Sequence, residues 1–263
     1  MVERVTITIK PDILRKIDEM IDGKAIRNRS HAVEHLLLKY LGKIDTALIL
    51  AGGSKKIKSL ISIHGKPILE HQINMLKKYN INNILLSIDH GYDKIKDYFG
   101  SSFSGVNITY LVEDQPLGSA GSISLARAYV NDTFVALNVD TLINPNIPEI
   151  YDFHKKQGRV ATVILLTTDD PTAFGVVKMS GNRILEFIEK PKIANAPSRL
   201  VNGGLCIFEP QIFDLLPKGK LMIESLFDNL AREGQLSGYV HDGMIFDVGK
   251  DYDKAEKYWK DLS

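Results

Sequence analysis

The order of polar and apolar residues predicts a short strand and two helices at the beginning of the chain. Polar and apolar residues alternate over residues 4–9, with the period of two that is typical of a strand. Apolar residues then recur at helical spacing over residues 11–21 and 30–41. Pro11 suits the first turn of the first helix, and Ser30 is a candidate N-cap for the second.

A different pattern begins near residue 46, where continuous apolar runs alternate with amphipathic stretches. The run at residues 46–51 has the composition of a buried parallel strand and leads into Gly52-Gly53. Alternating strands and helices predict an α/β fold for residues 44–263, preceded by a separate small domain at residues 1–43. Further strands are predicted at residues 84–88, 108–112 and 134–139, and helices at residues 68–79 and 91–99.

Composition and charge are those of a globular protein with a basic excess in the small domain. The 263 residues are 44% apolar and 25% charged, and the net charge is +1. Residues 1–43 hold nine Lys or Arg and six Asp or Glu, whereas the remainder of the chain holds 24 and 26. A basic small domain suits a polyanion such as nucleic acid, although ordinary surface scatter gives the same balance.

Neither a disulfide-based fold nor a membrane protein is expected. Cys206 is the only cysteine, and it lies in an apolar run where a buried structural thiol is expected. No apolar stretch approaches the roughly 18 residues that spanning a bilayer needs. The first residues show no hydrophobic signal region. We therefore expect a cytoplasmic protein with no membrane partner.

A single strand in the small domain leaves its backbone groups unpaired, which favours pairing with the same strand of a second chain. The resulting ribbon would present Arg4, Thr6 and Thr8 from both chains on one face, and such a ribbon fits the major groove of DNA. This segment resembles the ribbon-helix-helix repressor family, in which Ser30 would belong to the phosphate-contacting helix start. The resemblance implies a homodimer or higher homo-oligomer that binds double-stranded DNA. The alternative is a dimerisation arm that binds no DNA.

The large domain carries polar and glycine residues directly after its predicted strands. Gly52-Gly53 lets backbone N–H groups approach a ligand at the carboxyl end of the first strand, where open α/β sheets bind ligands. Asp140 ends a later strand, and together with a second Asp it can hold a hard cation such as Mg²⁺. A single Asp can equally well cap the following turn.

Taken in order, the motifs of the large domain resemble the sugar-1-phosphate nucleotidyltransferases, and most closely the mannose- or heptose-1-phosphate guanylyltransferases. The resemblance covers residues 46 to about 258 and implies a glycosyltransferase-A-like, Rossmann-like nucleotidyltransferase fold. The motifs are Gly52-Gly53, residues 115–121, Asp140, residues 174–177, Glu189-Lys190-Pro191, residues 202–204 and residues 246–249.

The resemblance also implies site residues and a reaction. An oxygen of a sugar 1-phosphate would attack the α-phosphorus of a nucleotide in line, and pyrophosphate would leave. Positioning and charge neutralisation by Mg²⁺ and lysines would suffice, because the attacking phosphate is already ionised. The matching residues are, for the nucleotide, Ala51, Gly52, Gly53, Gln115 and Gly118; for the metal, Asp140 and Asp247; for the sugar, Gly175, Glu189 and Asn202; and, as catalytic lysines, Lys58 and Lys190.

The loop after Gly53 departs from the pattern of the family. The Gly-Gly turn of the family is followed by x-Gly-Thr-Arg-Leu and several further residues before the lysine, whereas here only residues 54–57 separate Gly53 from Lys58. The absent arginine would neutralise charge on the triphosphate, and preorganised donors of this kind contribute about 3–4 kcal/mol each. Lys55 and Lys56 either supply point charges in its place or are ordinary surface lysines.

Two functions are open from the sequence. Loss of triphosphate contacts, with base, sugar and metal residues kept, favours a ligand-responsive transcriptional regulator whose large domain senses a nucleotide or nucleotide-sugar. The alternative is an active Mg²⁺-dependent enzyme, which would convert a nucleoside triphosphate and a sugar 1-phosphate into a nucleotide-sugar and pyrophosphate. In that case the small domain would dimerise the enzyme or regulate the protein's own expression.

Overall fold

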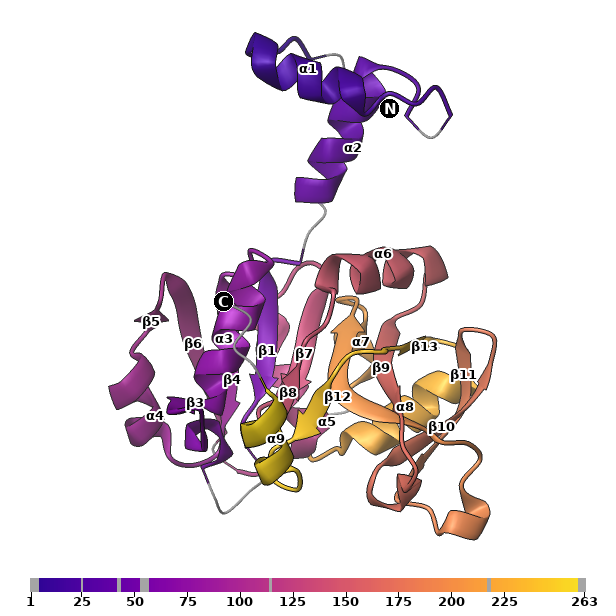
Figure 1. The fold of residues 1–263 in the computed structure, drawn as a ribbon. Helices are drawn as coiled ribbons and strands as arrows, with labels where there is room; N and C mark the ends of the chain where they lie inside the picture. The colour runs from indigo at the N-terminus through magenta and orange to yellow at the C-terminus, as the bar shows by residue number, and fades with distance from the viewer. Residues whose placement is uncertain are drawn as a thin grey trace. The chain divides into compact units, whose positions relative to one another are not determined.

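The structure is a computed structural model that describes residues 5–24, 26–41, 44–52, 57–113, 115–216 and 219–259. Over these residues the chain divides into two compact units, residues 1–43 and residues 44–263, and each is described by itself (Figure 1). Within the described ranges, the helices lack the length and continuous apolar character that a bilayer span requires.

The first unit consists of two helices joined by an ion pair and a small apolar contact. These helices are α1 (Pro11–Glu19) and α2 (Arg29–Leu41). The guanidinium of Arg29 donates to both carboxylate oxygens of Asp18, at 2.6 and 2.8 Å. Among the side chains of the pair whose burial is described, two apolar ones are buried, Ile17 and Ala32. So small a core contributes little burial, which leaves this unit dependent on its polar contacts.

The amino-terminal cap of α2 differs from the expected one. The side-chain oxygen of Asn28 accepts the backbone N–H of His31 at 2.9 Å, and the helix begins at Arg29. Ser30 therefore lies exposed within the first turn. The prediction of Ser30 as the N-cap is wrong, because an asparagine two residues earlier makes the hydrogen bond that the hydroxyl would have made.

The strand predicted at the beginning of the chain is not formed in the single chain. Residues 5–10 form neither strand nor helix, and Val5 and Ile7 are 77% and 56% exposed. A strand needs a neighbour to pair its backbone groups, and no strand of the described part of the chain pairs with this segment. Arg4 lies outside the described residues. The two threonines predicted to face DNA are exposed: Thr6 and Thr8.

The second unit is built on a large mixed sheet. Among the described residues, its strands follow the order β10-β11-β13-β9-β12-β7-β1-β4-β6-β5. Its parallel centre consists of β7 (Phe134–Asn138), β1 (Thr46–Leu50), β4 (Asn83–Ile88) and β6 (Val106–Val112). The other strands are β5 (Ser102–Phe103), β9 (Ala161–Thr167), β10 (Gly175–Ser180), β11 (Arg183–Glu189), β12 (Leu200–Phe208) and β13 (Leu236–Val240). Because β12 runs antiparallel to both β7 and β9, the sheet is not wholly parallel.

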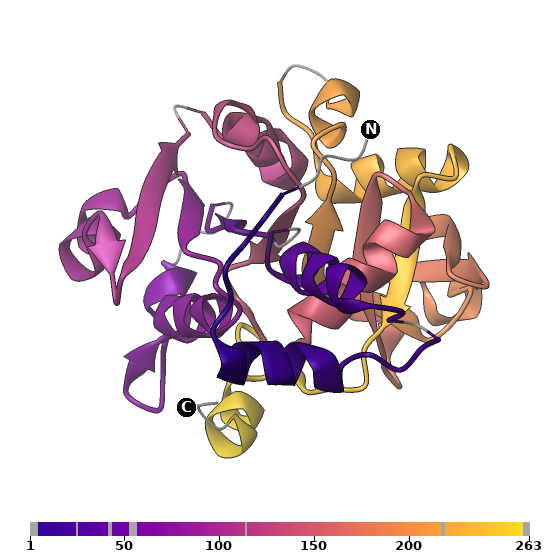
Figure 2. The same ribbon diagram turned by 90° about the horizontal axis from the view of Figure 1, so that it is seen from above.

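Helices cover both faces of this sheet and give three layers (Figure 2). One face is covered by α3 (Ile68–Lys78), α4 (Tyr92–Phe99) and α6 (Ile147–Gln157). The other is covered by α5 (Gly118–Ser124), α7 (Ile212–Leu215) and α8 (Ile223–Arg232). Side chains of β1 alternate between the layers, since Ala47 and Ile49 pack in the first core and Leu48 in the second. The predicted α/β fold of this unit is confirmed.

The parallel strands β1, β4, β6 and β7 end at the same edge of the sheet, which is where open α/β sheets place their ligands. Two small ribbons and a helix complete this unit. They are β2 (Ser62–Ile63) with β3 (Lys66–Pro67), β8 (Thr141–Ile143) with β14 (Ile245–Asp247), and α9 (Tyr252–Tyr258).

The cysteine of the chain is buried, as predicted. Cys206 lies in β12 among the residues of the second core. Burial raises the pKa of its thiol well above the ordinary value. A thiol with a raised pKa stays protonated at neutral pH and is a poor nucleophile. Cys206 is therefore a structural residue.

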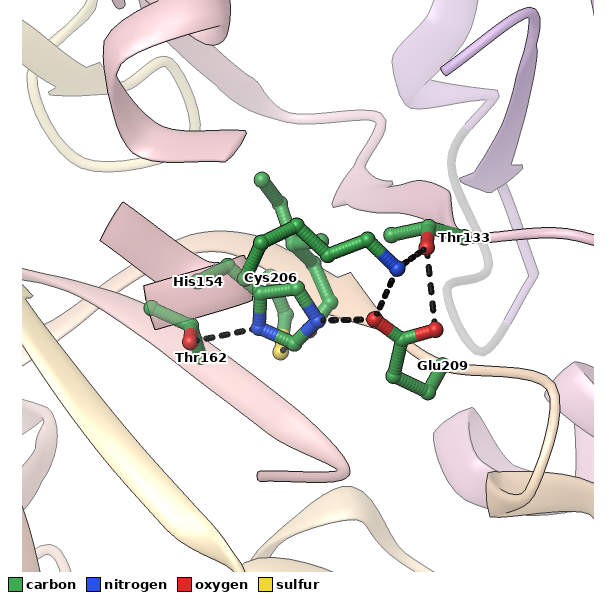
Figure 3. Close-up of polar contacts among 7 residues, drawn as sticks. Thr133, His154, Thr162, Cys206 and Glu209 are labelled. Atoms are coloured by element: carbon green, nitrogen blue, oxygen red, sulfur yellow. Dashed lines mark hydrogen bonds and ion pairs between the residues drawn. The ribbon is translucent and has the colours of Figure 1, made fainter. Parts of the chain in front are cut away.

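A polar network joins α6 to the sheet near the amino-terminal ends of β7 and β9 (Figure 3). Buried His154 forms a hydrogen bond from Nε2–H to Glu209 at 3.0 Å, and its Nδ1 shares a hydrogen bond of 2.7 Å with the Thr162 hydroxyl. The Lys155 ammonium and the Thr133 hydroxyl also donate to Glu209, at 2.7 and 2.9 Å. Burial disfavours the charged form of Glu209, but these three donors outweigh burial and lower its pKa from 4.5 to about 2.

Replacing Glu209 with Gln should lower the free energy of unfolding at pH 7 by about 1–3 kcal/mol, because it leaves buried donors unpaired. The depressed pKa means that this contribution is fully present above pH 4.5 and is lost as the pH falls towards 2. Urea denaturation at pH 7 and pH 3.5 should therefore give a smaller difference from the wild type at the lower pH. Glu233→Gln, at an exposed carboxylate, is the control. Equal differences at both pH values would contradict the linkage.

Candidate active site

A cavity of about 810 Å³ opens at the carboxyl edge of the parallel strands. Residues after four strands line it, namely Gly52 after β1, His90 after β4, Glu113 after β6 and Asp140 after β7. Its other walls include Lys58, Pro116, Gly118, Ser119, Lys220 and Met222. A cavity of this size with convergent polar groups is typical of a small-molecule site.

Glu113 organises the wall between β6 and α5. It is 8% exposed, and its Oε1 accepts the hydroxyls of Ser87 and Ser122 at 2.9 and 2.5 Å. Its Oε2 accepts the backbone N–H of Leu117 at 2.9 Å. Sequence reasoning missed this residue. The sequence feature that could have identified Glu113 is its position directly after the apolar run at residues 108–112.

The segment around Leu221 lies against the beginning of α5. The Leu221 carbonyl accepts the backbone N–H groups of Ala120 and Gly121 at 3.0 and 3.1 Å, and its own N–H donates to Leu117 at 2.9 Å. Gly118 has a φ of +72°, and a Cβ there would lie 2.7 Å from the Leu221 carbonyl oxygen. Glycine is therefore required at this position by the approach of the Leu221 segment, whatever else the residue contacts.

Lys58 and Asp140 form an ion pair in the cavity, although they are far apart in the sequence. Lys58 lies in the short 3₁₀ helix η1 (Lys58–Leu60), and Asp140 lies in the turn between β7 and β8. The Lys58 ammonium donates to Oδ2 of Asp140 at 2.5 Å, and both side chains are partly accessible. A positive and a negative group are thus available to a ligand at one point.

A smaller cavity of about 200 Å³ shares Asn138 and Asp140 with the larger one. It includes Lys190, whose ammonium donates to Glu189 at 2.8 Å. That hydrogen bond to Glu189 raises the pKa of Lys190, so the ammonium form is favoured. Further lining comes from Gly175, Asn202, Gly204 and Asp247.

Asp247 is brought next to Asp140 by the pairing of β14 with β8. Asp247 lies opposite Thr141 in that antiparallel pair, and the Val248 N–H donates to the Asp140 carbonyl at 2.8 Å. The Asp247 carboxylate lies 3.3 Å from the Lys250 ammonium. Both carboxylates line the smaller cavity.

The two carboxylates fit a magnesium ion. Mg²⁺ prefers oxygen ligands, and it is commonly held by one or two carboxylates while waters and substrate phosphates complete its coordination. Among the described residues, no group of three or more His, Cys, Asp and Glu side chains is placed to hold a metal. Asp140 and Asp247 each already face a lysine ammonium, which shows that positive charge is accommodated there.

Most residues assigned to the site by sequence lie in these two cavities. Gln115 is exposed and Ala51 is half-buried, and neither is among the described residues that line these two cavities. Gly53 and residues 54–56, including the two lysines considered as substitutes, lie outside the described residues. The residues that come together are Gly52, Lys58, Gly118, Asp140, Gly175, Glu189, Lys190, Asn202 and Asp247.

The second unit is similar in sequence to known nucleotide-handling enzymes. The pattern that defines the family described as "Nucleotidyl transferase" matches residues 46–262. The chain is 31% identical to the mannose-1-phosphate guanylyltransferase catalytic subunit beta of Xenopus tropicalis, over 79% of this chain and 62% of the relative. It is 32% identical to the mannose-1-phosphate guanyltransferase of Saccharomyces cerevisiae, over 74% of this chain and 56% of the relative. The chain thus spans 56–62% of the length of these relatives.

The fold is also similar to solved structures. A Bacillus anthracis protein proposed to be a glucose-1-phosphate thymidylyltransferase matches with a TM-score of 0.73 and 26% identity. The match covers 83% of this chain and 96% of that protein. The family match begins at residue 46 and does not reach the first unit. The ribbon-helix-helix assignment of that unit therefore stays a prediction.

We expect an alanine at Gly118 to be more destabilising than an alanine at Gly105. Both glycines have a positive φ, +72° and +83°, so either alanine is strained, but a Cβ at Gly105 meets no atom within 4 Å. The free energy of unfolding should fall by about 1–2 kcal/mol for Gly105→Ala and by about 2–5 kcal/mol for Gly118→Ala. Urea denaturation measures both. Equal losses would show that the Leu221 segment does not restrict the loop.

Proposed function

We propose, since the chain belongs to the nucleotidyl transferase family, that its second unit transfers a nucleotidyl group to a sugar 1-phosphate and releases pyrophosphate. The observation that carries the proposal is the position of Asp140, which lines both cavities beside Lys58. A nucleotide in the larger cavity and a sugar phosphate in the smaller one would meet there. The relatives named mannose-1-phosphate guanylyltransferase favour this enzyme over the regulator that the sequence alone favoured.

In the proposed reaction, an oxygen of the sugar 1-phosphate attacks the α-phosphorus of a nucleoside triphosphate. A new P–O bond forms, and the bond to the β-phosphate breaks as pyrophosphate leaves. Lys58 neutralises phosphate charge where the cavities meet, and Lys190 does so in the smaller cavity. Asp140 and Asp247 would hold Mg²⁺, which supplies charge neutralisation to the phosphates when bound.

Glu113 supports guanine as the base. An ionised carboxylate only accepts hydrogen bonds, and guanine presents two adjacent donors, N1–H and the N2 amino group. Oε2 of Glu113 accepts the Leu117 N–H, and a carboxylate oxygen on the cavity wall can accept a second hydrogen bond. We therefore assign base contact to Glu113 in place of the exposed Gln115. Mannose 1-phosphate is the proposed second substrate, held by Gly175, Glu189, Lys190 and Asn202.

Purified protein should release pyrophosphate from GTP and mannose 1-phosphate in the presence of Mg²⁺, and faster than from other nucleoside triphosphates. Asp140→Asn should lower kcat by about 100-fold or more, since loss of one preorganised charged group in an active site costs about 2.7–4 kcal/mol. A coupled pyrophosphate assay measures both. Asp132→Asn, at an exposed carboxylate before β7, should leave kcat unchanged. Full activity in Asp140→Asn, or no turnover with any substrate pair, would contradict the proposal.

The exposed amino-terminal segment favours a second function for the first unit. Val5 and Ile7 are exposed apolar residues directly before two packed helices. We propose that this segment pairs with its copy in a second chain and that the ribbon presents Thr6 and Thr8 to duplex DNA. A dimerisation arm that binds no DNA is the alternative.

Charged side chains at the proposed ribbon interface should separate the two copies. Val5→Lys/Ile7→Lys should lower the mass measured by light scattering, because like charges would face each other in the paired strands. Thr6→Ala/Thr8→Ala should keep the mass and weaken binding to duplex DNA about 10-fold or more, measured by anisotropy at fixed ionic strength. An unchanged mass in the lysine variant would argue against ribbon pairing. If the wild type does not bind DNA, the first unit is a dimerisation arm only.

A further inference from the structure

Asp140 lies in a turn, and Gln72 forms hydrogen bonds to the backbone of that turn both before and after Asp140. It lies in the second turn of α3 and is 2% exposed. Its side-chain amide donates to the carbonyl of Asn138 at 2.8 Å and to the carbonyl of Thr141 at 2.7 Å. Only the NH₂ end of the amide can donate to both carbonyls, which fixes its orientation. One group thus spans the turn between β7 and β8.

The two hydrogen bonds of Gln72 come with a cost to folding stability. Oε1 of Gln72 is buried and has no hydrogen-bond partner among the described residues. An unpaired buried oxygen costs free energy of folding, and an apolar side chain of similar shape would avoid that cost. What the apolar side chain would lose is the pair of hydrogen bonds to the turn.

The helix that carries Gln72 also anchors the segment of Lys58. The backbone N–H of Ile68, the first residue of α3, donates at 2.8 Å to the carbonyl of Ile61, directly after η1. One helix therefore supports both partners of the Lys58–Asp140 ion pair. Movement of Asp140 relative to α3 would change the geometry at the junction of the two cavities.

We propose that Gln72 is a positioning residue for the metal site. By fixing the turn, it presents the Asp140 carboxylate to a divalent cation together with Asp247. This inference rests on the proposed function, in which Asp140 holds Mg²⁺. Gln72 acts through the backbone on either side of Asp140 and does not touch substrate. Outer residues that orient a metal ligand typically contribute 10- to 100-fold in metal affinity.

Gln72→Met tests the proposal in the full-length protein. Methionine has a similar length, lacks the two donors and removes the unpaired oxygen, so the fold is expected to be retained. The probe is Mn²⁺ alone, titrated while the signal of free Mn²⁺ is followed by electron paramagnetic resonance. Mn²⁺ affinity should fall about 10- to 100-fold. The Mg²⁺ concentration for half-maximal pyrophosphate release should rise by a similar factor, with kcat at saturating Mg²⁺ near the wild-type value.

Leu76→Ala is the matched control, because Leu76 is fully buried in the core below the same helix and its loss leaves the two hydrogen bonds of Gln72 in place. Thermal denaturation gives the stability of both variants, and Gln72→Leu replaces Gln72→Met if the latter does not fold. Wild-type Mn²⁺ affinity in the Gln72 variant, or an equal loss in Leu76→Ala, overturns the inference and leaves the proposed function standing. Absence of Mn²⁺ binding by the wild type overturns both.

Discussion

The pairing of β8 with β14 is the contact on which the candidate site depends. β8 begins directly after Asp140, β14 ends at Asp247, and their register sets Asp247 opposite Thr141. Backbone hydrogen bonds therefore hold two carboxylates from distant parts of the chain close together. Like charges so placed repel each other, and each has a lysine beside it, Lys58 for Asp140 and Lys250 for Asp247.

In the proposed reaction, this distribution of charge would by itself call for a divalent metal, whatever the relatives require. A nucleoside triphosphate carries several negative charges, which the carboxylates of the two cavities would repel. A divalent cation between carboxylates and phosphates turns that repulsion into attraction. The lysines balance only part of the acidic lining. The carboxylates are Asp89, Glu113, Asp140, Glu189, Glu224, Asp247 and Asp251, and the lysines are Lys58, Lys190, Lys220 and Lys250.

Functional residues at strand ends were predictable from sequence, whereas the residues that position them were not. Asp140 follows an apolar run, and parallel strands gather such residues at one edge of a sheet. Glu113 also follows an apolar run, but its burial and its serine partners appear only in the fold. Gln72 offered no local signal, because its acceptors are backbone carbonyls, which every residue possesses. The strand predicted at residues 4–9 needs a partner, and no strand in the described part of the chain pairs with it.

In the proposed reaction, the short connection between Gly53 and Lys58 would affect the triphosphate end of the nucleotide more than the base and the sugar. Lys58 keeps its anchorage, because the segment after η1 is bonded to α3 and its ammonium reaches Asp140. The arginine that the family resemblance leads one to expect would contact the triphosphate end, which leaves as pyrophosphate. Loss of one such donor slows a reaction about 100- to 1000-fold and leaves product contacts in place. We therefore expect the protein to bind a nucleotide-sugar tightly while it turns over slowly. A protein with these two properties could act both as an enzyme and as a sensor.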